Sequence, residues 1–134
     1  MELIPHGIGS ISLGMSPAQV ESILGRHYTY EEWMGGNLND SLLYPGIVIS
    51  FNHSDGSGPL DDSQASEIWI HSTYPTTLVG QDVFSLYKVD IENLLNAKEV
   101  DFESVNDIWV PEYGWEFCFD ENKPVIAIYL LAAY

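Results

Sequence analysis

Histidines and carboxylates are the side chains that can hold a metal ion, and their spacing in this chain decides against such a site. The chain has 4 histidines, which are His6, His27, His53 and His71. No two of them lie three or four residues apart, the spacing that places two ligands on one helix face. His53, Asp55 and His71 flank a predicted hairpin and can meet there, but such histidines are more often ordinary surface residues. We therefore expect no metal site and no cofactor.

A cysteine nucleophile would have to be Cys118, because the chain has only 1 cysteine. Reactive cysteines are thiolates whose pKa is lowered by neighbouring positive charge. Cys118 is expected in the middle of a strand, on the face opposite Phe117, with Glu116 and Asp120 close by. Those acids raise the pKa of a thiol. The pattern therefore predicts a structural cysteine.

The adjacent acids Glu31-Glu32 and Asp61-Asp62 are candidates for general acid–base catalysis. Adjacent acids in loops are, however, usually solvated. The chain contains no nucleophile elbow, phosphate-binding loop or dinucleotide-binding motif. We therefore do not expect an enzyme, and a small enzyme with an acidic pocket for a cationic or neutral substrate stays the alternative.

The charge of the chain excludes several classes of partner. With Lys+Arg 4 and Asp+Glu 20, the formal net charge is −16. Each half, 1–75 and 76–134, carries a net −8, so the negative charge is spread over the whole chain. Such a chain is repelled by nucleic acid and by anionic membranes. Because residues 1–7 lack a basic region and an apolar segment, we expect a cytoplasmic protein without a membrane span.

Aromatic residues lie next to acidic residues at several places in the sequence. This arrangement is typical of a protein-binding surface. Trp and Tyr anchor interfaces, and surrounding carboxylates speed the encounter with a basic partner. The chain has 4 tryptophans and 8 tyrosines. The candidate partner-binding residues are Tyr30, Glu31, Glu32, Trp33, Asp61, Asp62, Glu67, Trp69, Glu103, Asp107, Trp109 and Glu112.

A short helix is predicted to follow Ser16, and it is the clearest local signal in the chain. Ser16 suits the N-cap, Pro17 suits the first helical position, and Gln19 completes a capping box. Gly25 ends the helix after about two turns. The buried stripe is predicted to be Val20, Ile23 and Leu24.

A second helix over about residues 87–96 and a set of strands complete the predicted elements. The strands are predicted at residues 42–51, 65–72, 108–110, 114–120 and 125–131, and residues 7–13 are compatible with a short strand or an extended lead-in. In 65–72, Ile68 and Ile70 face inward, and Trp69 shares the other face with its acidic neighbour Glu67. The pattern predicts an α+β fold, in which short helices cover one face of an antiparallel sheet.

The two halves of the chain are similar to each other, which favours an internal repeat. The aligned segments are 20–24 with 91–95, 46–51 with 114–119, and 68–70 with 128–130. We expect a single domain, 1–134, with a helix–strand–strand unit repeated in 7–72 and 78–131. Chance similarity between amphipathic elements is the alternative.

The pattern Leu-Gly-Met-Ser-Pro-x-x-Val-x-x-x-Leu-Gly over residues 13–25 resembles the helix entry of two groups of small bacterial proteins. One group is shaped like the β-lactamase inhibitor protein and the small lipoprotein subunit of the outer-membrane barrel-assembly machinery. The lipoprotein branch needs a signal peptide and a lipidated cysteine near the start, and this sequence has neither. The other group contains immunity proteins that neutralise toxins delivered between cells.

The resemblance implies a protein whose task is to bind another protein. Together with the acidic charge it predicts an immunity-type inhibitor that occludes a basic toxin, for which a nuclease is the first choice. The −16 charge and the aromatic–acid clusters favour the same kind of partner. A structural or adaptor subunit that pairs through its sheet edges is an alternative. The oligomeric state stays open.

Overall fold

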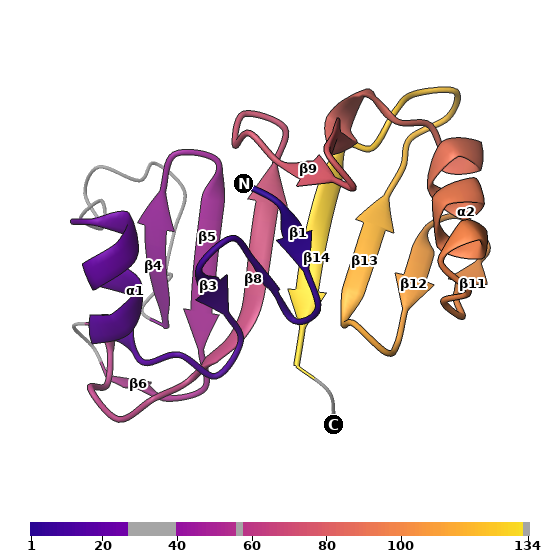
Figure 1. Cartoon of the computed structure of the whole chain (residues 1–134). Helices are drawn as coiled ribbons and strands as arrows, with labels where there is room; N and C mark the ends of the chain where they lie inside the picture. The colour runs from indigo at the N-terminus through magenta and orange to yellow at the C-terminus, as the bar shows by residue number, and fades with distance from the viewer. Residues whose placement is uncertain (27–39, 56–57, 133–134) are drawn as a thin grey trace.

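Seven strands form a continuous antiparallel sheet in the computed structural model, which describes residues 1–26, 40–55 and 58–132 (Figure 1). These strands are β4 (Ser41–Tyr44), β5 (Ile47–Phe51), β8 (Ala65–His71), β11 (Glu103–Ser104), β12 (Ile108–Val110), β13 (Trp115–Cys118) and β14 (Ala127–Leu131). Their order across the sheet is β11-β12-β13-β14-β8-β5-β4. The two helices described below complete an α+β fold, which confirms the predicted fold class. Strand β14 lies at the centre of the sheet.

Shorter strands form a meander at the N-terminus and two separate hairpins. The meander consists of β1 (Leu3–Ile4), β2 (Gly7–Ile8) and β3 (Ile11–Ser12). The hairpins are β6 (Ser54–Asp55) with β7 (Gly58–Pro59), and β9 (Thr77–Leu78) with β10 (Gln81–Asp82). A single strand over 7–13 is therefore wrong, because Gly9, with φ 58°, turns the chain between β2 and β3.

Helix α1 (Pro17–Leu24) begins and ends where the sequence predicts. The Ser16 hydroxyl accepts a hydrogen bond from the Gln19 amide at 3.2 Å, and the Gln19 side chain accepts one from the Ser16 amide at 2.9 Å. This reciprocal pair satisfies two amides that a helix start leaves unpaired. The predicted stripe is only partly right: Val20 is buried, whereas Ile23 is 38% exposed.

Helix α2 (Lys88–Ala97) and α1 pack on the same face of the sheet, at opposite ends. In Figure 1, α1 stands beside β4, α2 stands beside β11 and β12, and the N-terminal meander crosses the centre. Ile91 and Leu95 of α2 join the same buried cluster as Val20 of α1. The indole of Trp115 donates a 2.8 Å hydrogen bond to the Ile4 carbonyl, which ties the meander to the sheet. No helix in the described ranges is long and apolar enough to cross a bilayer.

Residues 42–51, predicted as one strand, form the hairpin of β4 and β5 instead. Gly46 makes the turn, with φ 77°. A Cβ at this position would also lie 2.6 Å from the Thr73 hydroxyl and 2.8 Å from the Tyr74 amide, so glycine is required for space as well as for conformation. Because the residues before and after this turn are hydrophobic, a hydrophobicity pattern does not show where β4 ends and β5 begins.

A short 3₁₀ helix, Val83–Ser85, precedes α2. The Asp82 carboxylate caps it by accepting a 3.1 Å hydrogen bond from the Phe84 amide. The Leu86 carbonyl then accepts a 3.0 Å bond from the Val125 amide, which connects the start of α2 to the approach of β14. The connection holds α2 against its half of the sheet.

The sheet has one covered face and one open face. Side chains alternate between faces along a strand. The covered face carries buried residues such as Ile68 and Ile70 of β8 and Phe117 of β13, which pack under the helices. The opposite face, called the open face below, carries Glu67, Trp69 and His71 of β8, and none of these belongs to the buried cluster. The predicted division of 65–72 between two faces is confirmed.

The halves of the chain meet at the β8–β14 pair. β5 and β13 lie next to this pair, and β4 and β12 lie next to them. The segments aligned in the sequence, 46–51 with 114–119 and 68–70 with 128–130, thus occupy matching places on the two sides of the junction. Their origin from a repeated unit stays a prediction.

Candidate protein-binding surface

Two tryptophans, a tyrosine and a glutamate lie side by side across the open face. Trp109 of β12 pairs in register with Glu116 of β13, Glu116 with Tyr129 of β14, and Tyr129 with Trp69 of β8. All four are half-buried. Residues directly opposite each other in neighbouring strands bring their Cβ atoms to about 4.5–5.5 Å. These four residues are called the aromatic–acid row.

Two acids predicted from the sequence extend the negative charge around the row. Glu103 of β11 pairs in register with Trp109, at the outer end of the row. Glu67 lies two residues before Trp69, on the same face and opposite Leu131 and Ser50. Burial raises the pKa of Glu67, and the nearby charges of Asp40 and Glu116 raise it further. The acids on this face therefore repel one another, which favours the arrival of positive charge.

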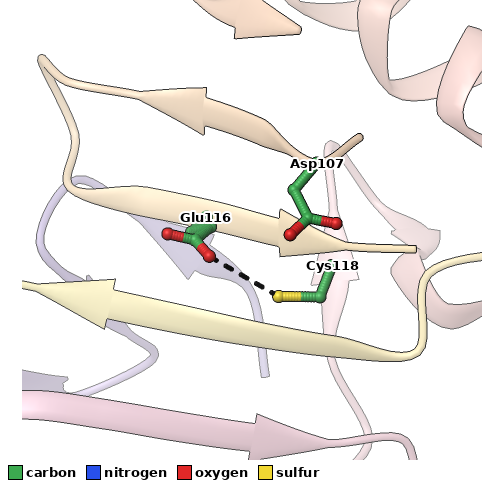
Figure 2. Close-up of side chains that lie close together, drawn as sticks. All are labelled: Asp107, Glu116 and Cys118. Carbon is green, nitrogen blue, oxygen red and sulfur yellow. Dashed lines mark hydrogen bonds between the residues drawn. The ribbon is translucent and has the colours of Figure 1, made fainter. Parts of the chain in front are cut away.

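A further acid, Asp107, lies with Glu116 and Cys118 on this face (Figure 2). The Cys118 thiol donates a hydrogen bond to Glu116 Oε1 over 3.8 Å, and Asp107 Oδ1 accepts one from the Phe119 amide over 3.0 Å. Burial, with the charges of Asp107 and Glu116, raises the pKa of the Cys118 thiol to about 12. The predicted direction is confirmed, although Asp107 rather than Asp120 is the second acid.

Among the residues that the structure describes, Asp107, Glu116 and Cys118 are also the group whose atoms come near enough to ligate an ion. One ligand atom from each lies within 4.8 Å of the others. Without an ion, the raised pKa keeps the Cys118 thiol protonated at neutral pH, so a metal would have to displace this proton to bind. The group fits hydrogen bonding to a cationic donor better than it fits a metal centre. Burial likewise raises the pKa of Tyr129 in the adjacent strand, so its phenol also stays protonated.

No positive side chain lies in the strands of the sheet. The basic residues are Arg26, Lys88, Lys98 and Lys123, and all are in α2 or in loops. Lys123 pairs with Asp120 at 3.6 Å, and the ammonium of Lys88 donates to the Val105 carbonyl. In the ranges that the structure describes, no salt bridge joins a lysine or arginine to Glu67, Asp107 or Glu116. The strands of the open face thus carry acids without a lysine or arginine, and their basic group is His71 of β8, whose ring centroid lies 5.6 Å from that of Trp69.

The open face brings together part of the set of binding residues predicted from the sequence. Glu67, Trp69, Glu103, Asp107 and Trp109 lie on it.

The other predicted binding residues lie elsewhere. Asp61, Asp62 and Glu112 are exposed in loops rather than on the strands of this face. Tyr30, Glu31, Glu32 and Trp33 lie outside the described residues.

Sequence reasoning missed Glu116 and Tyr129 as site residues. Their places follow from the pairing of β14 with β13 and β8, which joins segments distant along the chain. The alternation within each strand was a usable signal, since Glu116 and Cys118 fall on the face opposite Phe117. Which strands are neighbours was not readable from one sequence.

A groove of about 500 Å³ lies apart from the row, at the start of α2. Tyr87, Lys88, Val105, Phe119 and Lys123 contribute to its walls. Glu67, the carboxyl with the raised pKa, is not among its lining residues. In a catalytic pocket, an acid with a shifted pKa would line the cavity, and Glu67 does not line this groove. Comparison with protein-family models, curated proteins and solved structures finds no match for the chain.

Proposed function

We propose that this protein is an immunity-type inhibitor that binds a basic protein through the open face of its sheet and occludes the partner's active or substrate-binding surface. The partner we favour is a nuclease toxin, because a nuclease must present lysines and arginines to its substrate phosphates. The observation that carries the proposal is the aromatic–acid row, with Glu67, Glu103 and Asp107 around it and no lysine or arginine in the strands of the sheet.

The rings and the acids of the open face have different tasks in this proposal. Trp69, Trp109 and Tyr129 are half-buried and project from paired strands, so they lose little side-chain freedom on binding. Such rings are the usual anchors of protein interfaces. The surrounding carboxylates attract a basic partner over a distance and exclude acidic ones.

Occlusion requires no bond to be made or broken, which suits the chemistry of this face. The protonated Cys118 thiol is a poor nucleophile, and the half-buried Glu67 does not line the groove at the start of α2. We therefore propose a binding protein rather than an enzyme. We also place it in the cytoplasm, where a single half-buried cysteine stays reduced.

The proposal is tested with the basic protein encoded beside this chain in its source genome, because immunity proteins are encoded next to their toxins. We expect sub-micromolar binding by calorimetry, loss of the partner's nuclease activity at equimolar inhibitor, and affinity that falls as salt rises. A partner that binds only above micromolar concentration, or binding that leaves the nuclease active, contradicts the proposal.

A charge-matched pair of variants separates the open face from the net charge. Glu67→Gln with Glu116→Gln removes two charges from the open face, whereas Glu99→Gln with Glu121→Gln removes two from exposed sites outside the sheet. We expect the first pair to weaken binding by about tenfold or more, as for desolvated interface charges, and the second by less than about twofold. Equal effects would assign the binding to net charge alone.

The adaptor alternative predicts a different solution state. A subunit that pairs through sheet edges would use β4 or β11, the outermost strands. Light scattering of the isolated protein distinguishes the two: a monomer supports the inhibitor, and a stable homo-oligomer supports the adaptor.

A further inference from the structure

The aromatic–acid row has an order that specifies the cation it can receive. Glu116 stands in register between Trp109 on one side and Tyr129 on the other. With Cβ atoms of direct neighbours about 4.5–5.5 Å apart, a flat cation laid on either ring also reaches the carboxylate between them. The same cationic group can therefore contact the face of a ring and the oxygens of the Glu116 carboxylate.

The partial burial of the row makes the type of cation important. A guanidinium is flat, is weakly hydrated, stacks on rings and donates two parallel hydrogen bonds to a carboxylate. An ammonium is compact and strongly hydrated, and it loses more hydration on a half-buried surface. Because Trp109, Glu116 and Tyr129 are all half-buried, the row favours arginine over lysine.

The other acids and the thiol complete the surroundings of this position. Cys118 donates only a long 3.8 Å hydrogen bond to Glu116 Oε1, so the carboxylate keeps capacity to accept from a stronger donor. Asp107 and Glu67 add negative charge from the two sides of the row, while Lys88 and Lys123 are engaged elsewhere. Nothing positive in the strands competes for the place.

We infer that the open face recognises an arginine side chain of its basic partner, stacked on Trp109, the ring type that binds cations best, and paired with Glu116. This inference rests on the proposed function and adds the identity of the contacted residue. It makes the binding selective for arginine-bearing surfaces over equally charged lysine-bearing ones.

The test compares blocked peptides of identical length and spacing that carry arginine, lysine or the neutral isostere citrulline. Binding is followed by tryptophan fluorescence and by calorimetry at low salt. We expect the arginine peptide to bind wild-type protein about tenfold more tightly than the lysine peptide, the range of a desolvated cation–π contact, and the citrulline peptide to bind least.

Variants show whether the preference arises in the row. Glu116→Gln and Trp109→Leu should each bring the arginine-to-lysine ratio to within about twofold, whereas Tyr129→Phe, which keeps the ring, should preserve it. Glu99→Gln with Glu121→Gln should weaken both peptides equally and keep the ratio. Circular dichroism and thermal unfolding confirm that each variant is folded, and Glu116→Gln carries the test if Trp109→Leu does not fold.

The outcomes distinguish this inference from the proposed function. If arginine and lysine peptides bind wild-type protein equally, or if the arginine preference survives in Glu116→Gln, arginine recognition by the row is wrong while inhibition of a basic partner can still hold. If the neighbouring basic protein neither binds nor is inhibited, the proposed function is wrong, whatever the peptides do.

Discussion

The two ends of the open face differ although their strands occupy matching places in the sheet. On β4 and β5, Leu43 and Val48 stand in register with Trp69 and are only 3% and 9% exposed. On β12 and β13, the corresponding positions of the same row hold Trp109 and Glu116, which are half-buried. One end is closed and apolar, and the other presents rings and carboxylates.

This contrast shows that the sheet alone does not make a binding surface. Both ends have antiparallel strands, a helix on the covered face and the same alternation of side chains. The difference lies in the side chains on the open face. At one end they are apolar and buried, and at the other they are polar or aromatic and remain partly accessible. We therefore expect substitutions at the closed end to change stability, and substitutions at the accessible end to change binding.

The largest effect should come from the closed end. Leu43→Ala should lower the free energy of unfolding by about 2–4 kcal/mol, because a buried leucine leaves a cavity when truncated. Chemical denaturation measures this loss. Leu131→Ala, on the same face but half-exposed, is the control and should cost clearly less. Equal losses at the two positions would remove the distinction between the closed and accessible ends.

The accessible end should show the opposite balance. Trp109→Leu should weaken binding of the basic partner by about 30-fold, the size of an interface hot spot of about 2 kcal/mol, because it removes an anchoring ring. Its effect on the free energy of unfolding should be smaller than that of Leu43→Ala. Calorimetry with the partner and urea unfolding give the two numbers. A variant that loses stability but retains full affinity would place Trp109 with the closed end.

A helix cap gives a smaller and purely structural effect beside the closed end. Ser16→Ala should lower the free energy of unfolding by about 1 kcal/mol, since the Gln19 amide loses its hydroxyl acceptor. Ser22→Ala, within the same helix, should change it by much less. Denaturant titration of the two variants supplies the comparison, and partner affinity should be unchanged in both. Weaker binding after Ser16→Ala would show that α1 influences the accessible end.

The smallest expected effect is a pH dependence centred on Glu67. Its pKa is raised above the ordinary 4.5, so the folded state holds this proton more tightly than the unfolded state. The stability contributed by the protonated form is present below the ordinary pKa and is lost as pH rises through the raised value.

Glu67→Gln should remove this loss. The difference in unfolding free energy between the variant and wild type should therefore grow in favour of the variant as pH rises from about 4.5 toward neutrality. Denaturation at a series of pH values measures it. A difference that stays constant with pH would show that the carboxyl is not perturbed by burial and by its acidic neighbours.

Local signals were enough to predict the elements that depend on adjacent residues. Ser16, Pro17 and Gln19 specify the start of α1 through contacts within one helical turn, and alternation in 65–71 separates Trp69 from Ile68 and Ile70. The same locality explains the failures. Ile23 has the hydrophobicity of a core residue but points where no partner covers it, and the turn at Gly46 is surrounded by apolar residues that read as one strand.

The candidate site was only half predictable, because it depends on which strands become neighbours. Trp69 and Trp109 stand beside acids in the sequence and were selected for that reason. Tyr129 has no acid near it along the chain, and it comes into contact with the charges of Glu67 and Glu116 only through the pairing of β14 with β8 and β13. Tertiary pairing, rather than composition, decides its role.

The β8–β14 junction also affects how the chain folds during its synthesis. During synthesis β8 leaves the ribosome long before β14, so the nascent first half exposes an unpaired strand edge beside apolar residues such as Ile68 and Ile70. Closure of the sheet waits for a contact between segments far apart in the chain, which slows folding. The centre of the sheet is therefore the point at which premature termination or a folding delay would expose the chain to aggregation and to chaperones.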